Sequence, residues 1–160
     1  METITVKKLV THSLIALTLP ALIASGSQAL AAEKSSAERA IEYRESIMNI
    51  FSWNLKAMGS VVKGESAYDQ AAFAQHAADL AAAARLNLLA GFPEGSDEGE
   101  TGAKAEVWMT PDDFKEKYQA LQTKSEALVS AAASGNLDAI RPAFGDTANS
   151  CKECHKAYKE

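Results

Sequence analysis

Residues 35–64 read SSAERAIEYRESIMNIFSWNLKAMGSVVKG, and this stretch decides the fold. Ser35 and Glu38 form a capping box, which marks the start of a helix. One set of side chains then recurs every seven residues beside a second set in the same register. The first set is Ile41, Met48, Leu55 and Val62, and the second is Ala37, Arg44, Phe51 and Met58. Such a stripe predicts a long amphipathic helix that packs against other helices.

A second helix is expected over about residues 68–89, where Phe73, His76, Leu80 and Asn87 share one stripe among many alanines. Glycines, Pro93 and acidic residues then mark a long solvated loop that extends to residue 109.

The last two helices follow clear start signals. Thr110 as N-cap and Pro111 at the first helical position predict a third helix that extends to about residue 132. A turn at residues 134–136 separates it from a fourth helix over 137–158. Pro142 lacks a backbone donor, and it predicts a kink or a late restart in the fourth helix.

Four amphipathic helices with short connections and no strand pattern favour an all-α fold. We expect an antiparallel four-helix bundle with up-down-up-down topology. Cys151 and Cys154 fall on the core-facing stripe of the fourth helix, so a group bound to them lies inside the bundle.

The fourth helix carries the sequence Cys151-Lys152-Glu153-Cys154-His155, which holds the only two cysteines of the chain. A Cys-x-x-Cys-His run is the attachment signature of a c-type haem: each thiol adds to one vinyl group, and the imidazole reaches the iron. On a helix, both sulfurs and the ring project from one face. We therefore expect one covalently bound haem c.

Other interpretations of this motif can be weighed from the residues. A structural zinc site needs about four protein ligands, and the only other histidines are His12 and His76. A thioredoxin-like dithiol follows a strand, and no strand pattern precedes this pair. A plain disulfide, or a haem-free bundle that acts as a metal-binding or interaction protein, is the remaining alternative.

The N-terminal residues resemble a cleaved secretory signal. Lys7 and Lys8 precede an apolar stretch from about Ser13 to Ile23, and Ala29-Leu30-Ala31 offers small residues at a cleavage site. The stretch contains Pro20 and is shorter than the roughly 20 residues of a membrane-spanning helix, so an uncleaved anchor is the weaker alternative. We expect a signal peptide over residues 1–31, one domain over 32–160 with no membrane span, and location in the periplasm.

The domain over residues 32–160 is acidic. It holds 14 basic and 20 acidic residues, a net charge of −6. Such a surface repels nucleic acid and favours basic protein partners.

The chain resembles the class II c-type cytochromes, and most of all the cytochromes c′. The resemblance rests on the C-terminal haem motif, on Ala40-Ile41-Glu42-Tyr43-Arg44 and Val62-Lys63-Gly64-Glu65 in the first helix, on Glu106-Val107-Trp108, and on Ala143-Phe144-Gly145.

This resemblance implies that Cys151 and Cys154 hold the haem and that His155 is the proximal iron ligand. It places Arg44 near a haem propionate and Glu45 at the haem edge, where relatives often carry glutamine. Lys159 matches a basic residue beside the proximal imidazole, where a cation raises the reduction potential.

The role of Met48 determines what the iron meets on the side away from His155, and two interpretations remain open. In the first, it is an apolar lid at the position where cytochromes c′ block the iron, and the five-coordinate iron binds NO and CO rather than dioxygen. In the second, its thioether is the sixth ligand of a low-spin His/Met electron carrier. We favour the first, with electron transfer to a redox partner and diatomic-gas binding as joint roles. No residue set indicates an enzyme.

The first helix carries more apolar side chains than one buried face requires, among them Ile47, Ile50, Trp53 and Val61. A homodimer through the first two helices fits this excess. The alternative is that these side chains pack under the loop over residues 91–109.

Overall fold

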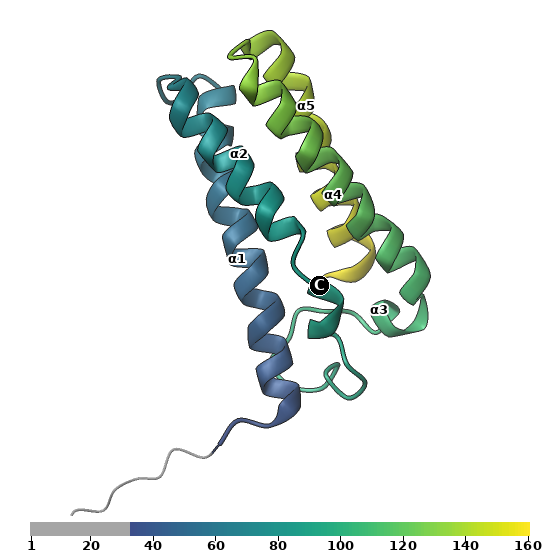
Figure 1. The fold of residues 1–160 in the computed structure, drawn as a ribbon. Helices are drawn as coiled ribbons and strands as arrows, with labels where there is room; N and C mark the ends of the chain where they lie inside the picture. The colour runs from purple at the N-terminus through teal and green to yellow at the C-terminus, as the bar shows by residue number, and fades with distance from the viewer. Residues whose placement is uncertain (1–32) are drawn as a thin grey trace, which may run out of the picture. The chain divides into compact units, whose positions relative to one another are not determined.

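The computed structural model describes residues 33–160, and the expected signal segment over 1–31 lies outside the described residues. Four long helices follow one another along the chain (Figure 1): α1 (Ser36–Val62), α2 (Gln70–Ala84), α4 (Pro111–Ala133) and α5 (Leu137–Tyr158). Between α2 and α4 lie a 3₁₀ turn, η1 (Leu88–Gly91), and a one-turn helix, α3 (Glu106–Met109). This arrangement confirms the all-α four-helix bundle.

Helix α1 begins where the capping box predicts. The Ser35 hydroxyl accepts a hydrogen bond from the backbone N–H of Glu38, and the Glu38 carboxylate accepts one from the N–H of Ser35. The expected stripe is buried at Ile41 and Phe51, but Ile47, which we placed off the core, is 2% exposed. A helix that packs against two neighbours buries a wider face than one heptad stripe.

Helix α2 ends earlier than predicted, at Ala84 instead of Leu89. The reason lies in α4, whose side chains take the last carbonyl groups of α2. The Tyr118 hydroxyl donates to the carbonyls of Ala84 and Leu86, at 2.8 Å each, and Gln122 also donates to Ala84. Asn87, which we placed on the helical stripe, is therefore exposed and outside any helix.

The loop before α4 is more ordered than predicted, because it includes η1 and α3. Thr110 holds the N-cap position of α4, but its side chain does not cap that helix. Its hydroxyl donates instead to the carbonyl of Glu106, at the start of α3. Thr110 thus closes the short helix before it rather than opening the long helix after it.

Helix α5 runs without interruption from Leu137 to Tyr158, so the late restart predicted at Pro142 does not occur. Asn136 caps the helix by accepting from the N–H of Asp138, and Gly135 makes the turn before it with a φ of 68°. Pro142 leaves the Asp138 carbonyl without its helical donor, and Asp138 is exposed, so water can bond to that carbonyl.

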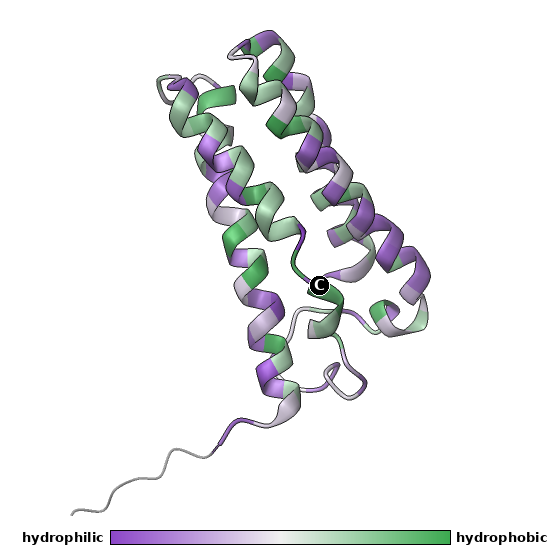
Figure 2. Ribbon diagram, in the orientation of Figure 1, coloured by the Kyte–Doolittle hydropathy of each residue, from purple (hydrophilic) through white to green (hydrophobic). Residues whose placement is uncertain are grey.

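The core runs through the centre of the bundle, with α2 packed on both α1 and α4, and α4 packed on α5. Figure 2 shows hydrophobic residues along much of α2 and at intervals along α1, while the part of α4 nearest α3 is mostly hydrophilic. A second, smaller core of Val107, Phe114 and Tyr158 joins α3 to the ends of α4 and α5. Its position fixes the end of α5 that carries the cysteine motif.

Candidate haem-binding site

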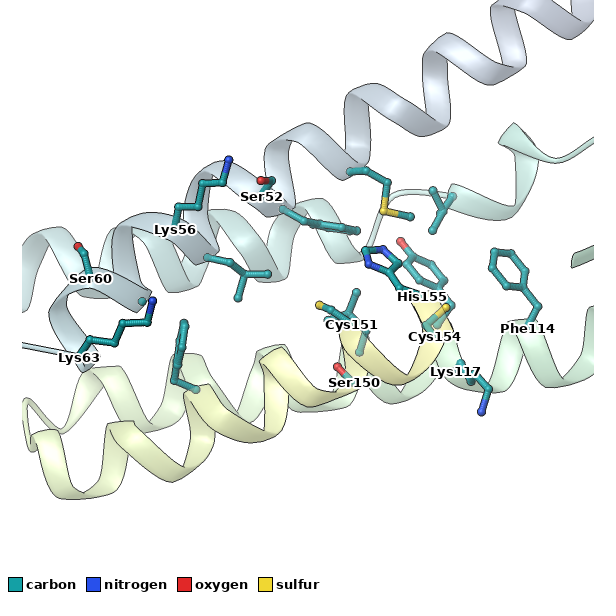
Figure 3. Close-up of a pocket in the computed structure, with 18 of the residues that line it drawn as sticks. Ser52, Lys56, Ser60, Lys63, Phe114, Lys117, Ser150, Cys151, Cys154 and His155 are labelled. Carbon is teal, nitrogen blue, oxygen red and sulfur yellow. The ribbon is translucent and has the colours of Figure 1, made fainter. Parts of the chain in front are cut away.

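The two cysteines and His155 lie on one side of α5 and line one cavity of about 550 Å³. Figure 3 shows the three residues on the last helix, on the side that faces α1. The cavity walls are mostly apolar, with Phe51, Leu55, Leu88, Leu121 and Phe144 among the lining residues. The structure therefore brings together the three residues that the motif predicts.

Burial controls the protonation of both thiols. It raises the pKa of Cys154 to about 11, with a smaller contribution from Cys151, and it also raises the pKa of Cys151. Both thiols are free in the structure and remain protonated at neutral pH. Since thiolates, not thiols, attack disulfides, the raised pKa values lower the reactivity of both cysteines toward disulfide exchange at neutral pH.

The imidazole of His155 has the opposite shift. Its partial burial, and then the positive charge of Lys159, lower its pKa below the usual value. The ring is therefore neutral at neutral pH and keeps a nitrogen lone pair for a metal.

Met48, on α1, borders the same space as His155. It is partly buried, and together with Phe114, Cys154 and His155 it lines both this cavity and a second one beside it. The other two methionines of the described chain lie elsewhere, since Met58 is fully buried and lines neither cavity and Met109 is 74% exposed. Met48 is thus the methionine that α1 presents to the site.

The second cavity, of about 340 Å³, continues from Met48 and His155 toward the loop before α3. Arg44, Glu45 and Lys159 line it, as does Thr101. All the haem-edge residues that the resemblance named therefore border the same space.

Arg44 itself is 3% exposed and bonds to the loop. Its two terminal nitrogens donate four hydrogen bonds of 2.7–2.9 Å, to the Gly91 carbonyl, to the carbonyl and hydroxyl of Ser96, and to the Thr101 hydroxyl. Its guanidinium also lies 4.6 Å from the ring centre of Phe92. These contacts make Arg44 the residue that holds the loop to α1.

The charge of Arg44 has no ion-pair partner within residues 33–160. Burial lowers its pKa, against the opposing charges of Glu45 and Asp97, yet a guanidinium remains charged in proteins. A buried cation without a carboxylate partner at the cavity edge matches an anionic group inside the cavity.

The end of α5 is tied to the same loop. The N–H of Lys104 donates to the Tyr158 carbonyl and the N–H of Glu160 donates to the Gly102 carbonyl, both at 3.0 Å. The Tyr158 hydroxyl donates to the carboxylate of Asp113 in α4. These bonds fix the last turn of α5, and with it the direction of His155.

Several residues that shape the site gave no signal in the sequence. Ser96 and Thr101 sit among acidic and glycine residues without any periodicity, and only the position of Arg44 reveals their role. His76, in contrast, lies away from both cavities, where it bonds to the buried Asn54 at 2.9 Å. This agrees with its place on the stripe predicted for the second helix.

These residues fit a covalently attached haem. Two free thiols and a neutral imidazole project from one helix face into an apolar space, whose volume is within the range of about 300–1,000 Å³ of small-molecule sites. The unpaired Arg44 at the edge suits a propionate. A bound haem would supply an iron that exchanges electrons and binds small axial ligands.

Fold and site together define a helical-bundle cytochrome of the c type. A sequence model of the family described as Cytochrome C′ matches residues 39–159, and the chain belongs to this family. The family binds haem c covalently, and the chain has the two cysteines for that linkage.

Individual relatives agree with this assignment. The chain is 38% identical over 125 residues to cytochrome c′ of Alcaligenes xylosoxydans xylosoxydans, covering 77% of this chain and 94% of that one. The structure of cytochrome c prime from Shewanella frigidimarina aligns with a TM-score of 0.76 at 37% identity, covering 80% of this chain and 99% of the other. A nitric oxide complex of a mutant cytochrome c prime from Alcaligenes xylosoxidans aligns with a TM-score of 0.72 at 37% identity, covering 80% and 98%.

The described helices also bear on membrane association. Within residues 33–160, none is both long and apolar enough to cross a bilayer.

Proposed function

We propose that the protein is a periplasmic cytochrome c′ that transfers electrons and binds NO or CO at a five-coordinate iron. Cys151 and Cys154 hold the haem, and His155 is the proximal ligand. The nitric oxide complex of a relative supports gas binding. We infer that the protein acts as a carrier and gas binder and not as an enzyme.

The observation that carries this proposal is that Met48 and His155 border the same space. Both residues line both cavities, one from α1 and one from α5. An apolar side chain in this place would shield the iron of a bound haem and would offer no hydrogen bond to dioxygen. NO and CO depend less on such a bond, so they are the ligands that a lid of this kind admits.

The same position also supports the second candidate, a six-coordinate electron carrier with Met48 as the sixth ligand. Met48 is the methionine that faces the site, and a thioether is an accepted iron ligand. The two candidates differ in one chemical respect, which is whether the Met48 sulfur bonds the iron.

Absorption spectra of the reduced protein, with and without CO, separate the two. We expect a high-spin spectrum that shifts on CO addition, little change in Met48→Leu, and faster CO association in Met48→Ala. Leucine keeps the apolar volume but lacks the sulfur, so it is the matched control. A low-spin reduced spectrum that ignores CO, and that becomes high-spin in Met48→Leu, would establish the alternative.

Arg44 and Glu45 form the haem edge in this proposal, and Lys159 acts beside the proximal imidazole. Arg44 supplies the charge that a propionate needs, and it offsets the repulsion between that propionate and Glu45.

Export and assembly complete the proposal. Cleavage after Ala31 gives a mature chain that begins at residue 32, which N-terminal sequencing of the periplasmic protein tests directly.

We also propose a homodimer through α1 and α2, supported by the exposure of Ile50 (42%) and Trp53 (73%) on α1. Trp53→Glu should then convert the dimer to a monomer in sedimentation experiments.

A further inference from the structure

We propose that the groove between α1 and α5, over the haem site, is the docking surface for an electron-transfer partner that presents acidic side chains. This inference rests on the proposed electron-transfer function. It concerns the charge around the cavity mouth, which has the opposite sign to the charge of the whole domain.

Lysines dominate the charged lining of the larger cavity. Lys56 and Lys63 of α1 and Lys117 of α4 line it, against one carboxylate, that of Glu65. Figure 3 shows Lys56 and Lys63 along the α1 side. Lys56 and Lys63 form no ion pair within residues 33–160, whereas Lys117 lies 3.7 Å from Asp113. The two α1 lysines are therefore free to attract an anionic partner.

The α5 side of the groove is also basic. Lys152 and Lys156 are exposed and lie four residues apart on the helix, and Lys159, also exposed, follows as its C-cap residue and lines the second cavity. Arg141 donates to the Val62 carbonyl of α1. Arg141 and Lys159 are thus the basic residues that α5 and its C-cap bring to the groove, whereas Lys152 and Lys156 line neither cavity.

Of the acidic residues within 33–160, Glu65 lines the larger cavity and Glu45 the smaller one, and the others line neither. Four of them are exposed in the loop between η1 and α3, namely Glu94, Asp97, Glu98 and Glu100. At physiological salt, charges are screened over about 8 Å, so a partner at the mouth of the larger cavity responds most to the lysines that line it. The net charge alone indicates a basic partner, but the local charge indicates an acidic one.

Small charged oxidants test the sign of the charge around the cavity mouth. In each reaction one electron passes from the reduced haem protein to the oxidant, ferricyanide becoming ferrocyanide or tris(phenanthroline)cobalt(III) becoming cobalt(II). At low ionic strength, Lys56→Glu/Lys63→Glu should slow oxidation by anionic ferricyanide by about tenfold and speed oxidation by the cationic cobalt complex. The control is Arg39→Glu/Lys115→Glu, which makes the same net charge change at exposed residues that line neither cavity.

Poly-L-glutamate then probes docking of an acidic chain. It should inhibit ferricyanide oxidation of the native protein and of the control variant at low salt, but not of Lys56→Glu/Lys63→Glu. Equal rates in the two variants would overturn the proposal. So would ferricyanide rates that respond to the lysines without inhibition by poly-L-glutamate, since the groove would then attract small anions only.

The intact mass and the reduced spectrum of each variant are recorded first. A protein without covalent haem, or one that cannot be reduced, contradicts the proposed function. A haem-loaded, reducible protein without charge sensitivity contradicts the docking surface alone.

Discussion

The two sides of the bundle are built differently. Between α2 and α4 the facing residues are small or fully buried: Ala77, Leu80, Ala84, Leu128 and Ala132 are each at most 1% exposed. Between α1 and α5 the corresponding residues Met48, Leu55, Phe144 and Cys151 are only partly buried, and they border a cavity of about 550 Å³.

Alanines allow helix backbones to approach closely, so the α2–α4 side closes with protein atoms alone. Larger side chains hold α1 and α5 apart where the cysteine motif lies. A haem attached to Cys151 and Cys154 would lie between α1 and α5 and would supply contacts that these two helices do not make with each other.

The largest effect should come from removing both thiols. Cys151→Ser/Cys154→Ser should lose all covalent haem, detected by intact mass and by haem staining on a denaturing gel. Its thermal midpoint should also fall further than that of any single alanine variant, because no haem then packs between α1 and α5. Unchanged stability would mean that the two sides do not differ in the way described.

Leu80→Ala and Leu55→Ala compare the two sides directly in the haem-loaded protein. Leu80→Ala should cost about 2–5 kcal/mol of unfolding free energy, because it opens a cavity in the closed side, and should leave the haem spectrum unchanged. Leu55→Ala should cost less than Leu80→Ala, because Leu55 is only partly buried, but should alter the CO association rate. Denaturant unfolding and stopped-flow measurements check the pair.

Arg44→Lys tests the contacts that hold the loop at the edge of the α1–α5 side. A lysine cannot replace the four hydrogen bonds to Gly91, Ser96 and Thr101, so the loss should be on the order of 2 kcal/mol, with faster proteolysis in the loop. Arg39→Lys, at an exposed position of the same helix, should change neither property.

We expect the smallest effect on stability from Tyr118, which lies on the α2–α4 side of the bundle. Burial raises its pKa to about 12, from an ordinary value of 10. A raised pKa means that the folded state holds the proton more tightly, so this contribution is complete below about pH 10 and is lost between about pH 10 and 12. Denaturant midpoints at about pH 9 and about pH 11.5 should therefore differ more in the native protein than in Tyr118→Phe.

The sequence was informative where one physical rule acted alone. The capping box and the heptad stripe placed α1 correctly, and Pro111 and Asn136 agree with the starts of α4 and α5. The cysteine motif predicted which side chains meet at one cavity, because helical spacing alone brings them together. Their role as haem ligands stays a prediction.

The errors arose where tertiary contacts decide. Helix α2 stops at Ala84 because Tyr118 and Gln122, far along the chain, take its carbonyl groups. Ile47 is buried because α1 meets neighbours on two sides. The bonds from Arg44 to Ser96 follow no sequence period, since they depend on where the loop returns to α1. Patterns within one element cannot reveal such partners.

The bonds from Arg44 also bear on the order of folding. They join residues 47 to 57 positions apart in the chain, and closing so long a segment costs entropy that must be offset by contacts formed earlier. We therefore expect the loop over residues 91–101 to settle after α1 and α2 have paired. Until then its peptide bonds are open to cleavage, so a protease can tell an incomplete molecule from a finished one at this loop.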